Sequence, residues 1–124
     1  MHKALSQCRE AGIKSVEIGS NHCYEKNYDY CTDFPFEYLV HNYFPIPRES
    51  FTLNIASLDN EIRKKSIEHI KTAIDFSAEI RAKLYTFHPG FLTDPLDSNN
   101  SHQNYDFQWD DDQLKLKDCV RAKN

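Results

Sequence analysis

Three apolar runs along the chain predict β-strands. They cover residues 13–19, 36–44 and 82–88. The middle run, "FEYLVHNYF", is largely apolar without strict alternation, which is typical of a parallel strand covered on both faces. Helical periodicity precedes the first run and separates the last two. Strands interleaved with helices pair in parallel through right-handed crossovers. The pattern therefore predicts an α/β fold with about three parallel strands.

Two segments have the apolar spacing of helices. In residues 3–11 the apolar side chains share one helical face, and Gly12 stands where a left-handed residue ends a helix. The longer helix is predicted over about 59–80, where apolar and small residues recur every three or four positions. This spacing predicts that Ile70 and Ile74 set the buried face, and that His69 lies on the solvent side.

Two histidines follow strands in equivalent positions. His41 is followed by a turn containing Pro45, and His88 is followed directly by Pro89. Because parallel strands end at the same edge of a sheet, and neighbours lie about 4.8 Å apart, we expect both imidazoles to face one site. They could bind one metal ion or a metal pair, and imidazole suits Zn, Mn, Co or Fe. The alternative is that each histidine is a hydrogen-bonded structural residue.

Composition narrows the class of protein. The 124 residues suffice for one domain with a core, and 40% are hydrophobic. A net charge of -4 indicates no polyanionic partner. No run approaches the about 18 apolar residues of a membrane helix, and there is no signal-peptide pattern. The four cysteines fit no CxxC motif, so we expect reduced thiols and a cytoplasmic protein.

The segments "LVHNYF", "LNIAS" and "IRKKSIEHIKTAIDFSAEIRAKLYTFHPGF" carry a resemblance to a known family. In this order they resemble the xylose isomerase-like TIM-barrel superfamily, which includes sugar-phosphate isomerases and epimerases and the endonuclease IV enzymes. The similarity runs from about Ala4 to Leu114 and is densest over 38–92. A complete (β/α)₈ barrel needs about 250 residues. The resemblance therefore implies that residues 1–124 form a single incomplete domain, a partial (β/α)₈ TIM barrel carrying three of eight strands.

The resemblance also implies roles for individual residues. In the endonuclease IV branch the histidines matching His41 and His88 are zinc ligands. In the sugar branches a divalent ion (Zn, Mn or Co) sits on later strands, and strand-end histidines contact substrate. His41 and His88 are thus expected to bind metal or substrate. Glu17 is a further substrate contact, unless it is a solvated strand-end carboxylate. Trp109 could stack on a sugar ring, or it packs against the long helix.

Three functions remain open. We expect a metal-dependent sugar or sugar-phosphate isomerase or epimerase ahead of an apurinic/apyrimidinic endonuclease. Segment 20–35 has a single lysine against three acids, and segment 93–112 has six aspartates and no lysine or arginine, so both would repel a DNA backbone. The third reading is a catalytically inert half-barrel that self-associates through exposed sheet edges. We expect a small-molecule sugar partner and neither nucleic acid nor membrane.

One position departs from the family pattern. Arg81 occupies the place between helix and strand that related chains usually give to a glycine. We expect a left-handed backbone there, at a cost of about 1 kcal/mol for a residue with a side chain.

Overall fold

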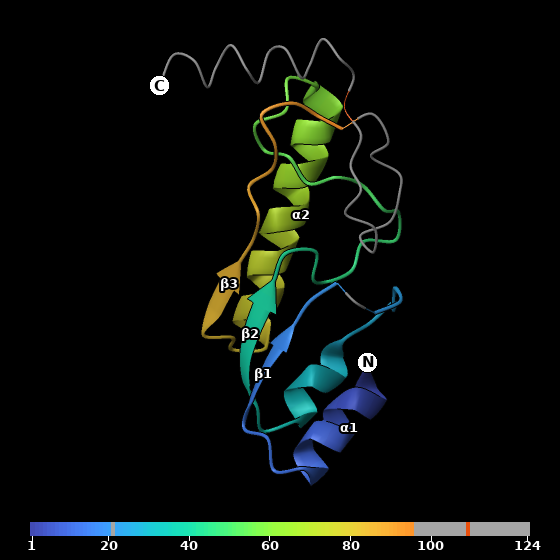
Figure 1. Cartoon of the computed structure of the whole chain (residues 1–124). Coiled ribbons are helices and arrows are strands. Elements are labelled where there is room, and N and C mark those ends of the chain that lie inside the picture. Colours follow the sequence, from blue (N-terminus) through green and yellow to red (C-terminus); the bar gives the residue numbers. More distant parts are fainter. Residues whose placement is uncertain (21, 96–108, 110–124) are drawn as a thin grey trace. The chain divides into compact units, whose positions relative to one another are not determined.

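The computed structural model describes residues 1–20, 22–95 and 109. Helices and strands alternate along the described chain, which confirms the predicted α/β class (Figure 1). The elements in order are α1 (His2–Glu10), β1 (Ser15–Ile18), the 3₁₀ helix η1 (Asp29–Asp33), β2 (Glu37–His41), α2 (Asn60–Glu79) and β3 (Leu84–Thr86). No helix among the described residues combines the length and apolar character needed to cross a bilayer.

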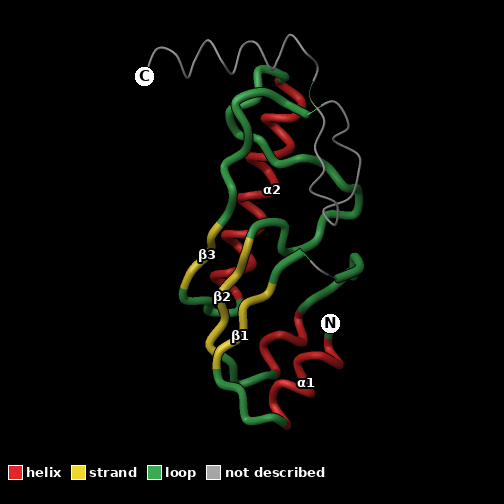
Figure 2. The backbone as a smooth tube through the Cα atoms, in the orientation of Figure 1, coloured by secondary structure: helices red, strands yellow, loops and turns green. Residues whose placement is uncertain are grey.

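The three strands form one parallel sheet in the order β1-β2-β3 (Figure 2). Side chains alternate between its two faces. One face carries the buried residues Ile18, Tyr38 and Val40, which belong to the hydrophobic core. The opposite face, which we call the open face, carries half-buried and exposed residues. They are Ser15, Glu17, Glu37, Leu39, His41, Leu84 and Thr86.

The chain divides into two compact units. The first comprises Met1–Arg48 and His69–Phe87, and therefore holds the whole sheet. Its core is strongly aromatic: the rings of Tyr28, Phe44 and Phe76 pack with centroids 4.7–6.2 Å apart. The second unit comprises Glu49–Glu68 and the chain from His88 onward. The prediction of a single domain over residues 1–124 stays a prediction.

The end of α1 is a Schellman motif, as the position of Gly12 predicts. The amide of Ile13 donates to the carbonyl of Cys8 at 3.0 Å, and the amide of Gly12 donates to the carbonyl of Arg9 at 3.0 Å. Gly12 has φ +73°, and no atom lies within 4 Å of where its Cβ would be. Position 12 therefore requires glycine because of its backbone conformation and not because of a lack of space.

The end of α2 repeats this motif without a glycine. Arg81 has φ +55°, which confirms the predicted left-handed backbone. Its amide donates to the carbonyl of Ala78 at 3.1 Å, and the amide of Ala82 donates to the carbonyl of Ser77 at 2.8 Å. Both helices therefore end with the same hydrogen-bond pattern. At the end of α2 this pattern places Arg81, a residue with a Cβ, in a strained left-handed backbone conformation.

Replacing Arg81 by glycine should stabilise the first unit by about 1 kcal/mol, because it removes this strain. Urea unfolding followed by the helical circular dichroism signal measures the change. The matched control is Gly12→Ala, which introduces the same strain at α1 and should destabilise by a similar amount. An Arg81→Gly variant less stable than the natural chain would show that the arginine side chain contributes more than its backbone costs.

The buried face of α2 differs from the predicted one. His69 is only 9% exposed, whereas Ile74 is 51% exposed. The buried stripe consists mostly of small or polar residues: Ser66, His69, Ala73, Ser77 and Ile80. The hydroxyls of Ser66 and Ser77 donate to carbonyls one turn earlier, at 2.7 and 2.6 Å, so they are buried at little cost. The prediction for His69 was wrong because polar side chains that hydrogen-bond within the helix can be buried. The spacing of apolar residues therefore does not identify the buried face of this helix.

Candidate functional site

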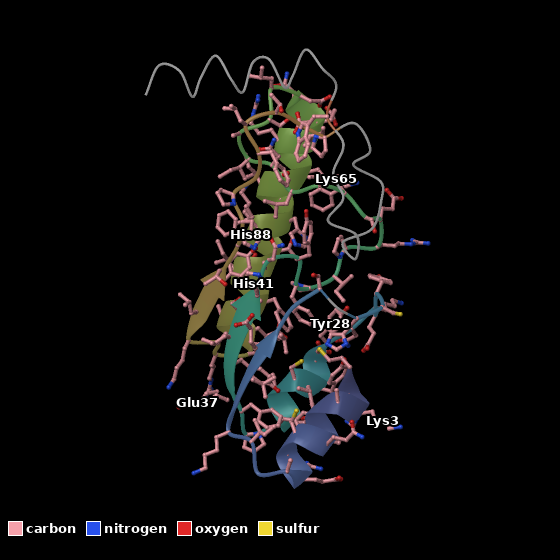
Figure 3. All side chains as sticks on the ribbon, viewed as in Figure 1. Lys3, Tyr28, Glu37, His41, Lys65 and His88 are labelled. Atoms are coloured by element: carbon pink, nitrogen blue, oxygen red, sulfur yellow. The ribbon has the colours of Figure 1, made fainter. Side chains whose placement is uncertain are left out.

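The open face has three rows of side chains across the strands. The row at the carboxyl ends consists of Gly19, His41 and Thr86, since His41 pairs with Thr86 and the position of a Gly19 Cβ lies 3.9 Å from the Cβ of His41. Glu17 lies in the middle row, opposite Leu39. Figure 3 shows His41 and Glu37 at opposite ends of β2. The first row is therefore where a parallel α/β sheet presents ligand-binding groups.

Ser15, Glu37 and Lys83 form the third row, at the amino end of the open face. The ammonium of Lys83 and the hydroxyl of Ser15 both donate to the Glu37 carboxylate, at 2.6 and 3.2 Å. These bonds, that from Lys83 foremost, lower the pKa of Glu37. Both members of the ion pair are more than half exposed. At this end of the open face the charged side chains therefore pair with each other.

His41 is held by the neighbouring strand. Its Nδ1 lies 2.8 Å from the hydroxyl oxygen of Thr86, so the two side chains share a hydrogen bond. The backbone pairing continues one residue further, because the amide of Asn42 donates to the carbonyl of Thr86 at 2.7 Å. Thr86 thus contacts β2 through both its side chain and its main chain, and it fixes the imidazole ring of His41.

The chain turns away immediately after His41. Asn42 has φ +52°, a conformation that asparagine tolerates better than most residues. This turn ends β2 at His41, whereas the predicted strand ran to residue 44. Asn42 is 8% exposed, and its Oδ1 is buried with no hydrogen-bond partner among the described residues. A buried amide oxygen beside a strand-end histidine is a group that a bound ligand or water could satisfy.

Two core residues hold this turn from behind. The hydroxyl of Tyr85 donates to the carbonyl of Asn42 at 3.0 Å, and His69 also hydrogen-bonds the backbone of Asn42. Burial raises the pKa of Tyr85 to about 12, so its hydroxyl keeps the proton that it donates. Burial lowers the pKa of His69. Both groups are therefore neutral at physiological pH, and they fix the turn without placing a charge in the core.

Glu17 and Gly19 complete the carboxyl end of the face. Glu17 is exposed and lies opposite Leu39, two residues before His41 on the adjacent strand, so the carboxylate and the imidazole are diagonal neighbours. Gly19 has no side chain, and a Cβ at this position would lie 3.9 Å from the Cβ of His41. The arrangement presents an acid–base pair on one solvent-facing surface.

His88 begins the part of the second unit that contains the "HPG" turn. The amide of Ile55 donates to the carbonyl of Pro89 at 3.0 Å. Gly90 has φ +128°, and a Cβ there would lie 2.2 Å from Oδ1 and 2.5 Å from Cα of Asn54. Glycine is required at position 90 by both conformation and space. The "HPG" turn and the "LNIAS" segment therefore dock directly on each other.

A polar network extends this docking. The side-chain amide of Asn54 donates to Asp94 Oδ1 at 2.7 Å, and the hydroxyl of Ser57 donates to Asp94 Oδ2 at 2.5 Å. Asn54 Oδ1 accepts from the backbone N–H of Ala56 at 3.1 Å, while the backbone N–H of Asn54 donates to Ser66 Oγ at 2.9 Å. Asn54 is fully buried. We call Asn54, Ser57 and Asp94 the loop clamp.

Trp109 lies in the second unit and is half-buried. Its indole N–H donates to the carbonyl of Thr93 at 3.1 Å, and its ring meets the Phe91 ring edge to face at 5.7 Å. These contacts tie Trp109 to the segment that follows the "HPG" turn, and its predicted stacking on a sugar stays a prediction. The other residues of 96–112 lie outside the described part of the chain.

The predicted metal site stays a prediction. No group of three or more His, Cys, Asp or Glu side chains converges within 1–20, 22–95 and 109. The carboxyl end of the open face offers one imidazole, His41, and one carboxylate, Glu17, whereas catalytic zinc sites use three protein ligands. His41 and His88 fall in different compact units, so their shared site stays a prediction. The described donors do not complete a metal centre, and we derive no step through one.

Comparison with known proteins gives one match. The model of a family described as xylose isomerase-like TIM barrel matches residues 5–117, which is most of the chain. No curated protein and no solved structure matches it. The match includes both strand-end histidines, the "LNIAS" segment, α2 and the "HPG" turn.

Proposed function

Because the chain belongs to the xylose isomerase-like TIM-barrel family, we propose that it takes part in the isomerisation or epimerisation of a sugar or sugar phosphate. The observation that supports this proposal is the carboxyl end of the open face. There an exposed carboxylate, Glu17, and a hydrogen-bonded imidazole, His41, lie diagonally on neighbouring strands. A proton shift beside a carbonyl needs a base and a group that stabilises the negative charge on the carbonyl oxygen, and these two side chains can fill both roles.

In this proposal Glu17 removes a proton from the carbon next to the sugar carbonyl and returns it to a neighbouring position or to the other face. His41 hydrogen-bonds the substrate oxygen on which negative charge develops, or moves a proton to and from it. The family resemblance implies a divalent ion (Zn, Mn or Co), and no step of this proposal passes through it. The residues described here supply the proton transfer and the orientation of the substrate.

The charges of the loop between β1 and β2 also support a small substrate over a nucleic acid. Residues 20–35 contain Lys26 as their one lysine or arginine, together with Glu25, Asp29 and Asp33. A phosphodiester backbone is bound mainly by clustered lysines and arginines. This loop therefore disfavours the endonuclease alternative, in which clustered zinc ions would activate water against DNA.

Solvent exchange tests the proposal. The protein is incubated with a panel of aldoses, ketoses and their phosphates in D₂O, with Mn²⁺, Co²⁺ or Zn²⁺ supplied, and NMR follows deuterium uptake beside the carbonyl. We expect uptake for at least one sugar, and a fall of about 100-fold or more in Glu17→Gln and His41→Ala.

Glu37→Gln is the matched control, because Glu37 lies on the same face at the opposite end of β2. It should exchange like the natural chain. Absence of exchange with every sugar would overturn the proposal, and a Glu17→Gln variant as active as the natural protein would overturn the assignment of Glu17. The metal content of the purified protein, compared with His41→Ala and His88→Ala, tests whether the histidines retain an ion.

A further inference from the structure

We propose that Thr86 is a positioning residue that selects the tautomer of His41. The Nδ1–H of His41 donates to the Thr86 hydroxyl oxygen, so that Nε2 carries the lone pair that meets the ligand. This inference rests on the proposed function above, because the acceptor role of Nε2 is what requires the proton on Nδ1. The chemistry offered is that of a neutral imidazole acceptor, which binds a sugar hydroxyl or a metal ion.

The geometry of the His41–Thr86 pair supports this role. His41 and Thr86 are register partners on adjacent parallel strands, and both side chains lie on the open face. The distance of 2.8 Å between Nδ1 and Oγ1 is that of a good hydrogen bond. Threonine is branched at Cβ, so its χ1 angle is restricted and its hydroxyl is held in few positions. Thr86 is thus a stiff partner for the ring.

β3 also fixes the backbone that follows the histidine. The carbonyl of Thr86 accepts the amide of Asn42, and the hydroxyl of the preceding residue, Tyr85, donates to the carbonyl of Asn42. Successive residues of β3 therefore act from opposite faces of the sheet. Tyr85 holds the turn after His41 from the core, while Thr86 holds the imidazole on the open face.

The position of the shared proton follows from the role proposed for His41. A threonine hydroxyl can donate or accept, so its contact with Nδ1 fits either tautomer, and the acceptor role proposed for Nε2 requires the proton on Nδ1. If the threonine hydroxyl donated to Nδ1, Nε2 would carry the hydrogen and could neither accept a proton nor bind an ion. If Nδ1–H donates, Nε2 has both abilities. Thr86 is exposed, so its own hydroxyl hydrogen can be satisfied by water.

The tautomer can be measured directly. Long-range ¹H–¹⁵N NMR of protein labelled with ¹⁵N-histidine, at a pH where imidazoles are neutral, distinguishes Nδ1–H from Nε2–H rings. The His41 signals are identified by their loss in His41→Gln. We expect the Nδ1–H pattern in the natural chain and in Thr86→Ser, and a shift toward Nε2–H in Thr86→Val.

Valine keeps the shape and β-branching of threonine, so Thr86→Val removes only the hydroxyl. A natural chain with His41 in the Nε2–H form would overturn the proposal, and so would a Thr86→Val spectrum identical to that of the natural chain. In the exchange assay Thr86→Val should be about 10- to 100-fold slower, with Thr86→Ser close to normal. If the natural chain exchanges no sugar, the proposed function fails, and the NMR result still decides the role of Thr86.

Discussion

Replacing Gly90 by alanine should destabilise the second unit by about 3–5 kcal/mol. The new Cβ would stand 2.2 Å from Oδ1 and 2.5 Å from Cα of Asn54, which is closer than real Cβ atoms come to any atom. The backbone at φ +128° is also one that residues with a side chain rarely adopt. Because Asn54 is fully buried, it has no space into which to retreat.

Trp109 is the single tryptophan of the chain, and its contacts with Phe91 and Thr93 make its fluorescence a probe of the second unit. Urea unfolding followed at this residue should show a lower midpoint in Gly90→Ala. Gly19→Ala is the matched control, since its Cβ would meet nothing closer than 3.9 Å. Equal midpoints for the two variants would contradict the tight docking of the "HPG" turn.

The second large effect is expected at the loop clamp. Asn54→Asp replaces the amide that donates to Asp94 by an oxygen, so that two carboxylates face each other where a 2.7 Å hydrogen bond stood. Asn54 is fully buried, and the new charge could not escape to solvent. We expect the free energy of unfolding to fall by about 3 kcal/mol, because Asp94 loses a hydrogen-bond donor and faces a second carboxylate that repels it.

The reciprocal double variant is the control that isolates this interaction. In Asn54→Asp with Asp94→Asn, the amide and the carboxylate exchange places and the hydrogen bond can form again. Most of the lost stability should return, again measured through Trp109 fluorescence. If the double variant is as unstable as the two single variants combined, the Asn54–Asp94 bond does not hold these loops together.

The helices and strands follow closely from the sequence because their signals are local. Gly12 and Arg81 mark the ends of both helices, and the structure has a left-handed backbone at each. His69 shows where such reasoning fails, since an apolar period does not reveal that Ser66 and Ser77 satisfy their hydroxyls within the helix. Burial of polar residues depends on bonds that a hydrophobicity pattern does not contain.

The candidate site was predictable only in part. The position of His41 at a strand end follows from its apolar run, but its partner Thr86 depends on strand register, which composition does not reveal. Asn54 and Asp94 lie forty positions apart in irregular segments, so no period links them. The nearest signal was the occurrence of "LNIAS" and "HPG" in one chain, and it indicates a family without saying which side chains touch.

The charged row of Ser15, Glu37 and Lys83 has a consequence for assembly. A second copy stacked flat against the open face would remove water from the Lys83–Glu37 ion pair. The free energy of this desolvation is larger than the small stabilisation that an exposed ion pair provides. β1 and β3 are the edge strands of the sheet, so the main chain on their outer sides can still pair with another strand. We therefore expect any oligomers to grow sideways by strand addition, with layered stacking suppressed.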